Sequence, residues 1–143
     1  MARLRIHRTE GVAEKWAQYP MQILPHLEAL RNLTLEAAEN LPAVTEIVET
    51  LKWGEPSFLV KGGSTVRIDW KAKNPDFIAL YFICTSGLVP VFKVLYGDTF
   101  QYEKDRALWF PVSEELPREP ILDCLSLAFS YHRVKHLPLL GRG

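Results

Sequence analysis

The stretch Thr65-Val66-Arg67-Ile68-Asp69-Trp70-Lys71 alternates apolar and charged side chains from Val66 onward. Alternation with a period of two is typical of a strand whose two faces meet different environments. It predicts one face in the core, made of Val66, Ile68 and Trp70, and an opposite face made of Arg67, Asp69 and Lys71. The segment therefore predicts a sheet that carries charged side chains on the side turned away from the core.

The next segment is an apolar run from Phe77 to Thr85, which we expect to be the following strand. Residues 72–76 separate the two runs and have the length of a hairpin loop. Symmetric closure of this hairpin predicts three pairs on the charged side: Lys71 with Phe77, Asp69 with Ala79, and Arg67 with Tyr81. The same register sends the alternate residues of the second strand into the core, namely Ile78, Leu80 and Phe82.

Three shorter segments complete the predicted sheet: residues 57–60, 100–103 and 107–112. Apolar residues recur at helical intervals elsewhere, which predicts helices over residues 11–17, 23–41, 88–95 and 120–135. The same spacing predicts a further helix over residues 42–51, ended by Trp53-Gly54-Glu55-Pro56. The order of elements predicts an α+β two-layer sandwich, in which an antiparallel sheet of about five strands has N-terminal and C-terminal helices packed on one face.

Length and composition favour one domain. The chain has 143 residues, of which 48% are hydrophobic, and 17 Lys and Arg balance 17 Asp and Glu. We expect a single domain over residues 20–140, preceded by an N-terminal extension over residues 1–19. Zero net charge argues against a nucleic-acid partner or a membrane-surface partner, since both need an excess of Lys and Arg. No apolar run approaches the ~20 residues of a membrane span, and the N-terminus has no apolar leader, so we expect a cytoplasmic protein.

Charge is unevenly distributed along the chain. Residues 26–60 hold six acidic and two basic residues, whereas residues 61–73 hold four basic residues and one acidic residue. Because an arginine can hold a carboxylate or phosphate through two hydrogen bonds, the basic strand predicts a site for a small anionic or polar ligand. Its candidate ligand-binding residues are Arg67, Lys71, Tyr81, Arg106 and Trp53. The alternative is a solvated charge lattice on the sheet, which has no ligand.

The acidic segment offers a second candidate site. Glu36/Glu39 and Glu46/Glu49 are spaced three residues apart, which places each pair on one side of a helix, where carboxylates could bind iron or another cation. No histidine accompanies them, and solvated helix faces have the same pattern. The sequence also has no phosphate loop, nucleophile elbow or zinc-ligand spacing, so we assign no catalytic residue and favour a non-enzymatic protein without a cofactor. A protein-interaction scaffold, as a monomer or a homodimer, remains an alternative.

Several motifs resemble a known family. They are Ala29-Leu30-Arg31, Lys52-Trp53-Gly54-Glu55-Pro56-Ser57-Phe58, the stretch from Gly63 to Trp70, Tyr81-Phe82, Asp105-Arg106-Ala107-Leu108, and the stretch from Tyr131 to Leu137. Over about residues 20–140, this set resembles the YdhG-like domain-of-unknown-function family. The resemblance implies a small, mostly bacterial, cytoplasmic α+β domain with an antiparallel sheet. Most members have no assigned activity, and one branch is described as a frataxin-like intracellular iron chaperone.

Overall fold

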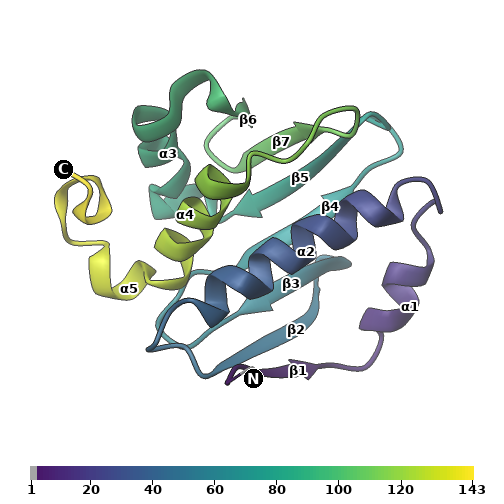
Figure 1. Ribbon diagram of the computed structural model, residues 1–143, viewed down its shortest axis with the longest axis horizontal. Helices are drawn as coiled ribbons and strands as arrows, with labels where there is room; N and C mark the ends of the chain where they lie inside the picture. The colour runs from purple at the N-terminus through teal and green to yellow at the C-terminus, as the bar shows by residue number, and fades with distance from the viewer. Residues whose placement is uncertain (1–2) are drawn as a thin grey trace.

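The computed structural model describes residues 3–143 (Figure 1). Its strands are β1 (Arg5–Arg8), β2 (Glu46–Lys52), β3 (Glu55–Leu59), β4 (Val66–Trp70), β5 (Phe77–Phe82), β6 (Gln101–Glu103) and β7 (Ala107–Pro111). Its helices are α1 (Val12–Ala17), α2 (Leu24–Glu39), α3 (Leu88–Tyr96), α4 (Arg118–Phe129) and α5 (Tyr131–Val134). Short 3-10 turns are η1 (Cys84–Ser86), η2 (Gly97–Thr99) and η3 (Pro138–Gly141).

The strands described form one sheet in the order β1-β2-β3-β4-β5-β7-β6. β1 runs parallel to β2, and every other neighbouring pair is antiparallel. The expected α+β class is therefore confirmed. The expected sheet of about five antiparallel strands is wrong in detail, because β1 and β2 extend it to a mixed sheet of seven strands within the described chain.

The helix expected over residues 42–51 is instead strand β2. Ile47 and Glu49 are buried on one side of this strand, and the two neighbours of Glu49 are only half-buried. A glutamate at the second buried position hides the period-two pattern, so the apolar residues matched a helical spacing by coincidence. The β-branched side chains Ile47, Val48 and Thr50 favour the strand.

A two-residue turn, Trp53-Gly54, joins β2 to β3. Both residues have positive φ, 57° and 75°, as a type I′ hairpin turn requires. The sequence Trp53-Gly54-Glu55-Pro56 therefore closes a hairpin instead of ending a helix, and Lys52 pairs with Glu55 across it.

The N-terminal segment takes part in the same sheet and the same core. β1 forms the edge strand beside β2, and Val12, Trp16 and Tyr19 join the central apolar cluster. These residues lie in the range that the sequence suggested as an extension, residues 1–19, of which the first two lie outside the described residues.

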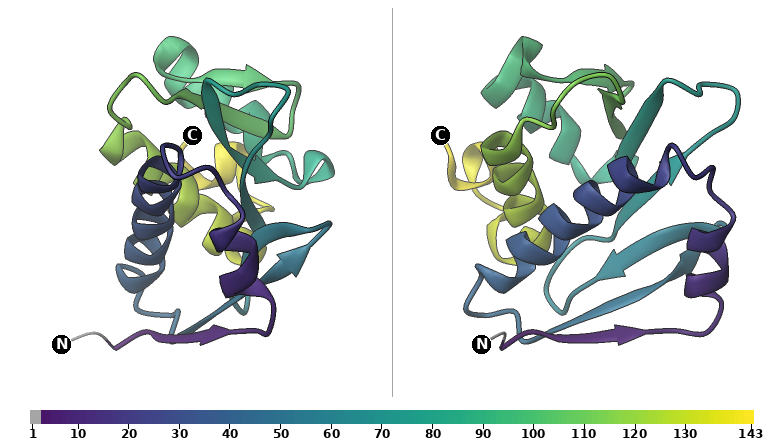
Figure 2. Two further views of the ribbon diagram at one scale, coloured as in Figure 1. Left: turned by 90° about the vertical axis from the view of Figure 1, so that its right-hand side faces the viewer. Right: turned by 45° about the vertical axis from the view of Figure 1, so that its right-hand side comes forward.

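The β4–β5 hairpin has the predicted register. Arg67 pairs with Tyr81 and Asp69 with Ala79, while the ladder ends at Trp70 and Ile78, one pair before the expected partners Lys71 and Phe77. The apolar members of both strands face α2 and α4, which lie on one side of the sheet (Figure 2). We call this side the core face and the opposite side, which carries Arg67, Asp69, Lys71 and Tyr81, the charged face.

The remaining expected helices are confirmed, with one interruption. α1, α2 and α3 match the predicted ranges closely, whereas the helix expected over residues 120–135 is divided at Ser130 into α4 and α5. Within the described chain, no helix has both the length and the apolar character needed to cross a membrane.

Glu49 is fully buried on the core face and connects four elements. Its carboxylate accepts hydrogen bonds from Arg31 of α2, at 2.8 to 3.2 Å, and from Trp16 Nε1 of α1, at 3.1 Å. Arg8 of β1 completes the ion pairs, with Nε 3.2 Å from Glu49 Oε1. The buried carboxylate is thus held by two guanidinium groups and one indole.

We expect Glu49→Gln to lower the free energy of unfolding by about 3 kcal/mol, because it removes the buried charge that Arg8, Arg31 and Trp16 bond and leaves both arginines without a charged acceptor. Urea denaturation followed by circular dichroism measures the change. Glu46→Gln is the matched control on the same strand. Its carboxylate is exposed and lies 3.9 Å from Arg5, so we expect a change within about 0.5 kcal/mol. Equal losses in the two variants would contradict this account of Glu49.

Candidate functional site

Tyr81 lies at the centre of a cluster of cations on the charged face. The Arg67 guanidinium carbon lies 5.7 Å from the centroid of the tyrosine ring, Lys71 Nζ lies 5.4 Å from it, and the Arg106 guanidinium carbon lies 5.8 Å from it. All three distances fall within the range of a cation–π interaction. Three positive charges and one aromatic ring therefore form a single site.

Strand pairing explains how these residues meet. Arg67 is opposite Tyr81 across the β4–β5 ladder, and Ala107 of β7 is the partner of Tyr81 on the other side. Arg106 precedes Ala107, and its carbonyl accepts a hydrogen bond from Phe82 N at 2.7 Å. The small side chains Ala79 and Ala107 pack beside Tyr81, which leaves space for long charged side chains to lie over the sheet.

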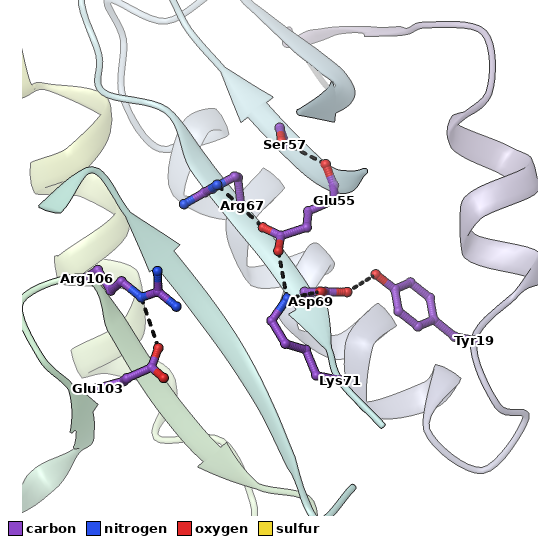
Figure 3. Close-up of polar contacts among 8 residues, drawn as sticks. All are labelled: Tyr19, Glu55, Ser57, Arg67, Asp69, Lys71, Glu103 and Arg106. Carbon is purple, nitrogen blue, oxygen red and sulfur yellow. Dashed lines mark hydrogen bonds and ion pairs between the residues drawn. The ribbon is translucent and has the colours of Figure 1, made fainter. Parts of the chain in front are cut away.

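Carboxylates fix the position of Lys71. Its Nζ donates to Glu55 Oε2 and to Asp69 Oδ2, both at 2.8 Å (Figure 3). Glu55 reaches this position because β3 and β4 pair at Ser57–Arg67 and Phe58–Val66, and no further pair follows among the described residues. Burial lowers the pKa of Lys71, but the hydrogen bonds to Asp69 and Glu55 outweigh it and raise the pKa above its ordinary value.

Tyr19 reaches the cluster from the segment between α1 and α2. Its hydroxyl donates to Asp69 Oδ1 at 2.6 Å, and its side chain is almost fully buried. Burial, with the hydrogen bond to Asp69, raises the pKa of Tyr19 far above its ordinary value. Asp69 is thus held by Tyr19 on one oxygen and by Lys71 on the other (Figure 3).

Two guanidinium groups beside Tyr81 retain free N–H donors. Arg67 Nη1 lies 3.6 Å from Glu55 Oε1, an ion pair beyond hydrogen-bond length, and Arg67 side-chain nitrogens make no hydrogen bond to any of residues 3–143. Arg106 Nε donates to Glu103 Oε1 at 3.1 Å, and its side chain is half-exposed. On the acceptor side, Glu55 Oε1 is buried and has no hydrogen-bond donor in the described chain. The site therefore combines unused donors with an unused acceptor.

The structure brings together four of the five predicted ligand-binding residues: Arg67, Lys71, Tyr81 and Arg106. Trp53 lies apart from them. It is 87% exposed at the tip of the β2–β3 hairpin, two residues before Glu55, and makes no hydrogen bond, cation–π or aromatic contact within residues 3–143. Its role in binding stays a prediction.

Three residues of the site were not predicted from the sequence: Tyr19, Glu55 and Glu103. Glu55 could have been found if residues 46–52 had been predicted as a strand, since the hairpin places Glu55 beside β4. Glu103 follows from the second hairpin, where it is three residues before Arg106. Tyr19 lies 50 residues from Asp69 in the chain, and no local pattern indicates their contact.

The four carboxylates proposed for a metal do not form one cluster. Glu46 and Glu49 lie on a strand and not on a helix, so their three-residue spacing sends Glu46 to solvent and Glu49 to the core. Glu36 pairs with Arg118, and Glu39 accepts the backbone N–H groups of Arg3 and Leu4 at 3.0 Å. Among the described residues, no group of three or more His, Cys, Asp or Glu side chains has the arrangement of a metal site.

Comparisons with protein-family models, with curated proteins and with solved structures found no significant match to this chain. The function must therefore be inferred from the site itself.

We expect Tyr19→Phe to lower the free energy of unfolding by about 2 kcal/mol at neutral pH, because it removes a buried hydrogen bond to a charged acceptor. The raised pKa adds a pH dependence. The stabilisation is complete below the ordinary tyrosine pKa of 10.0 and declines above it, because the unfolded phenol ionises there while the folded phenol does not. The wild-type advantage over Tyr19→Phe should thus shrink by about 1.4 kcal/mol at about pH 11.

Urea denaturation of both proteins at about pH 8 and about pH 11 measures this difference. The ionisation of other tyrosines and lysines is common to both proteins and cancels. A constant difference across this range would show that Tyr19 is not held in its neutral form.

Proposed function

We propose that this protein is a non-enzymatic module that binds a small anionic or polar ligand on the charged face. The observation that carries the proposal is the pair of guanidinium groups, Arg67 and Arg106, beside one buried tyrosine ring, each with unused N–H donors. A guanidinium whose N–H groups are not already bonded is suited to hold a carboxylate or phosphate through two hydrogen bonds. The ligand's anionic group therefore binds between Arg67 and Arg106.

Lys71 has a different role from the two arginines. Its ammonium group already bonds two carboxylates, so it contributes positive potential and holds Glu55 and Asp69 in place. Tyr81 forms the floor of the site. Its hydroxyl is neutral at physiological pH, and burial raises the pKa of Tyr81 further above that range. Arg67 and Tyr81 lie on the paired strands β4 and β5. Lys71 directly follows β4 and Arg106 directly precedes β7, so the sheet supports the site, as a selective site requires.

Charge balance narrows the class of ligand. Three carboxylates, from Glu55, Asp69 and Glu103, accompany the three cations. A polyanion is attracted by the arginines but repelled by these carboxylates. A ligand with one anionic group and one hydrogen-bond donor can bind both, its anionic group to the arginines and its donor to a carboxylate. Its donor would bond Glu55, whose buried Oε1 lies 3.6 Å from Arg67 Nη1 and accepts no hydrogen bond from residues 3–143. A zwitterion such as an amino acid has this chemistry.

The other functions expected from the sequence have less support from the geometry. In the iron-binding alternative, Glu36 and Glu49 bond arginines and Glu39 accepts backbone N–H groups. Glu46 is exposed and lies apart from Glu49, on the other side of β2 from the core. A protein-interaction scaffold, as a monomer or a homodimer, would use the same charged face, and light scattering would detect its assembly. From the sequence motifs we also propose that the chain belongs to the YdhG-like family and is located in the cytoplasm.

The proposal is tested by calorimetric titration with phosphate, acetate and glycine. We expect binding of at least one anionic probe by the wild type, and at least tenfold weaker binding by Arg67→Ala and by Arg106→Ala, since each loses a charge-assisted bidentate contact. Lys73→Ala is the control, because Lys73 is an exposed cation in the β4–β5 loop and its removal changes net charge equally.

Each outcome bears on the proposal. Equal weakening by Lys73→Ala would show a general effect of charge, and identical affinities in all four proteins would remove the charged face as the site. Failure of all three probes to bind at millimolar concentration would also contradict the proposal. Circular dichroism confirms that each variant is folded.

Trp53→Asn tests two properties of this exposed turn residue, its effect on the free energy of unfolding and its contribution to ligand binding. Asparagine tolerates the left-handed conformation of this turn position, so we expect the free energy of unfolding to rise by about 0.5 kcal/mol. If Trp53 covers the bound ligand, the same substitution weakens binding several-fold. Thermal denaturation and the titration above measure the two effects, and a stabilised variant with unchanged affinity would exclude Trp53 from the site.

A further inference from the structure

A hollow lies on the core-face side of the sheet, between α2 and the connection from β7 to α4. Figure 1 shows the course of these two segments. Its volume is about 760 Å³, within the range of sites for small organic molecules. One wall is the side of α2 that carries Pro25, Ala29 and Glu36, and the other is the connection over residues 112–117. We call this hollow the α2 groove.

The connection that forms one wall is anchored to the sheet. Val112 N donates to Asp76 O at 2.9 Å, and Glu114 N donates to Pro111 O at 3.2 Å. Arg118, at the start of α4, forms an ion pair with Glu36 of α2 and closes one end of the α2 groove. These contacts hold the two walls apart, so the groove is preformed.

The interior of the α2 groove is largely apolar. Leu33 and Ile78 are buried beneath it, and half-buried or exposed apolar side chains line the walls: Pro25, Ala29, Pro111, Val112 and Leu116. An apolar surface of this kind favours an apolar ligand body by the hydrophobic effect.

The charged groups at the rim are unbalanced. Arg118 and Glu36 neutralise one another, and Arg118 also lies 3.4 Å from Glu119. Glu114 and Glu115 form no ion pair or side-chain hydrogen bond with any residue that the structure describes, and both are exposed on the connection. His26, Asn32 and Ser113 supply the other polar groups of the lining. The rim thus carries two free negative charges beside an apolar interior.

We propose that the α2 groove binds a small organic cation, an apolar body that carries an ammonium group. The apolar body lies against Ala29, Leu33 and Ile78, and the ammonium group lies beside Glu114 and Glu115. Complementary charge selects this ligand over neutral or anionic molecules of the same shape.

This site is separate from the charged face. Ile78 and Ala79 are consecutive in β5 and point to opposite sides of the sheet, Ile78 toward the α2 groove and Ala79 toward Tyr81. The inference therefore does not rest on the function proposed for Arg67 and Arg106, and each site can be tested without the other.

The test uses three probes of similar shape: phenethylammonium, 2-phenylethanol and 3-phenylpropionate. Binding is followed by two-dimensional NMR of the isotope-labelled protein, in which shifted amide signals locate the site. We expect phenethylammonium to shift the amides of Ala29, Leu33, Ile78 and Val112, and to bind about fivefold more tightly than 2-phenylethanol at low salt. Added salt should reduce this preference, because the rim charges are exposed.

Three variants assign the effect. Glu114→Gln combined with Glu115→Gln should abolish the preference for the cation and leave binding of 2-phenylethanol unchanged. Glu119→Gln is the control, since this carboxylate is highly exposed and lies outside the groove lining. Ala29→Trp fills the groove from an exposed position of α2, so it should abolish binding of both probes without unfolding the protein.

Equal affinity for the three probes, binding that Ala29→Trp does not change, or shifts confined to the charged face would each overturn the proposal. So would the absence of binding at millimolar concentration. A concentration-dependent dimer that Ala29→Trp dissociates would assign the groove to a second copy of the chain and also overturn it.

Discussion

The buried carboxylate of Glu49 is the interaction on which the N-terminal half of this fold depends. It joins β2 to β1, α1 and α2 through Arg8, Trp16 and Arg31. Two of the elements that Glu49 fixes, β2 and α1, are followed in the chain by residues of the charged face. The β2–β3 hairpin delivers Glu55 to Lys71, and the chain leaving α1 delivers Tyr19 to Asp69. A network on the core face thus determines the geometry of a site on the opposite face.

The sequence predicted those parts of the fold in which local pattern and tertiary environment agree. Val66 to Lys71 alternates cleanly, and its core members are apolar, so both the strand and its register with Phe77 to Phe82 were predicted correctly. β2 was missed because Glu49 occupies a core position, where its two arginine partners come from segments far away in the chain. β1 was missed because all four of its residues are exposed, and an exposed edge strand has no apolar alternation.

The same reasoning explains which residues of the candidate site could be predicted from the sequence. Arg67, Lys71 and Tyr81 share one hairpin, so strand register alone brought them together. Arg106 follows from a second predicted hairpin, although only the order of β5 and β7 in the sheet shows that it reaches the same ring. The partners that decide charge and hydrogen bonding, Glu55 and Tyr19, depend on packing between distant segments. Sequence pattern predicted the cations of the site but not the carboxylates and the hydroxyl that hold them.

The separation of β3 from β4 beyond Ser57 and Arg67 has a mechanical consequence. Two residue pairs join these strands in the described chain, whereas the β4–β5 ladder has five. The sheet therefore has two parts, β1 to β3 and β4 to β7, that are joined by few backbone hydrogen bonds. Glu55 belongs to the first part, and its partners Arg67 and Lys71, with Asp69, belong to the second. Side-chain ion pairs replace the missing backbone hydrogen bonds between β3 and β4. A molecule that bonds both Glu55 and Arg67 would hold β3 and β4 together and oppose their separation. Occupancy of the site and the rigidity of the whole sheet are therefore coupled.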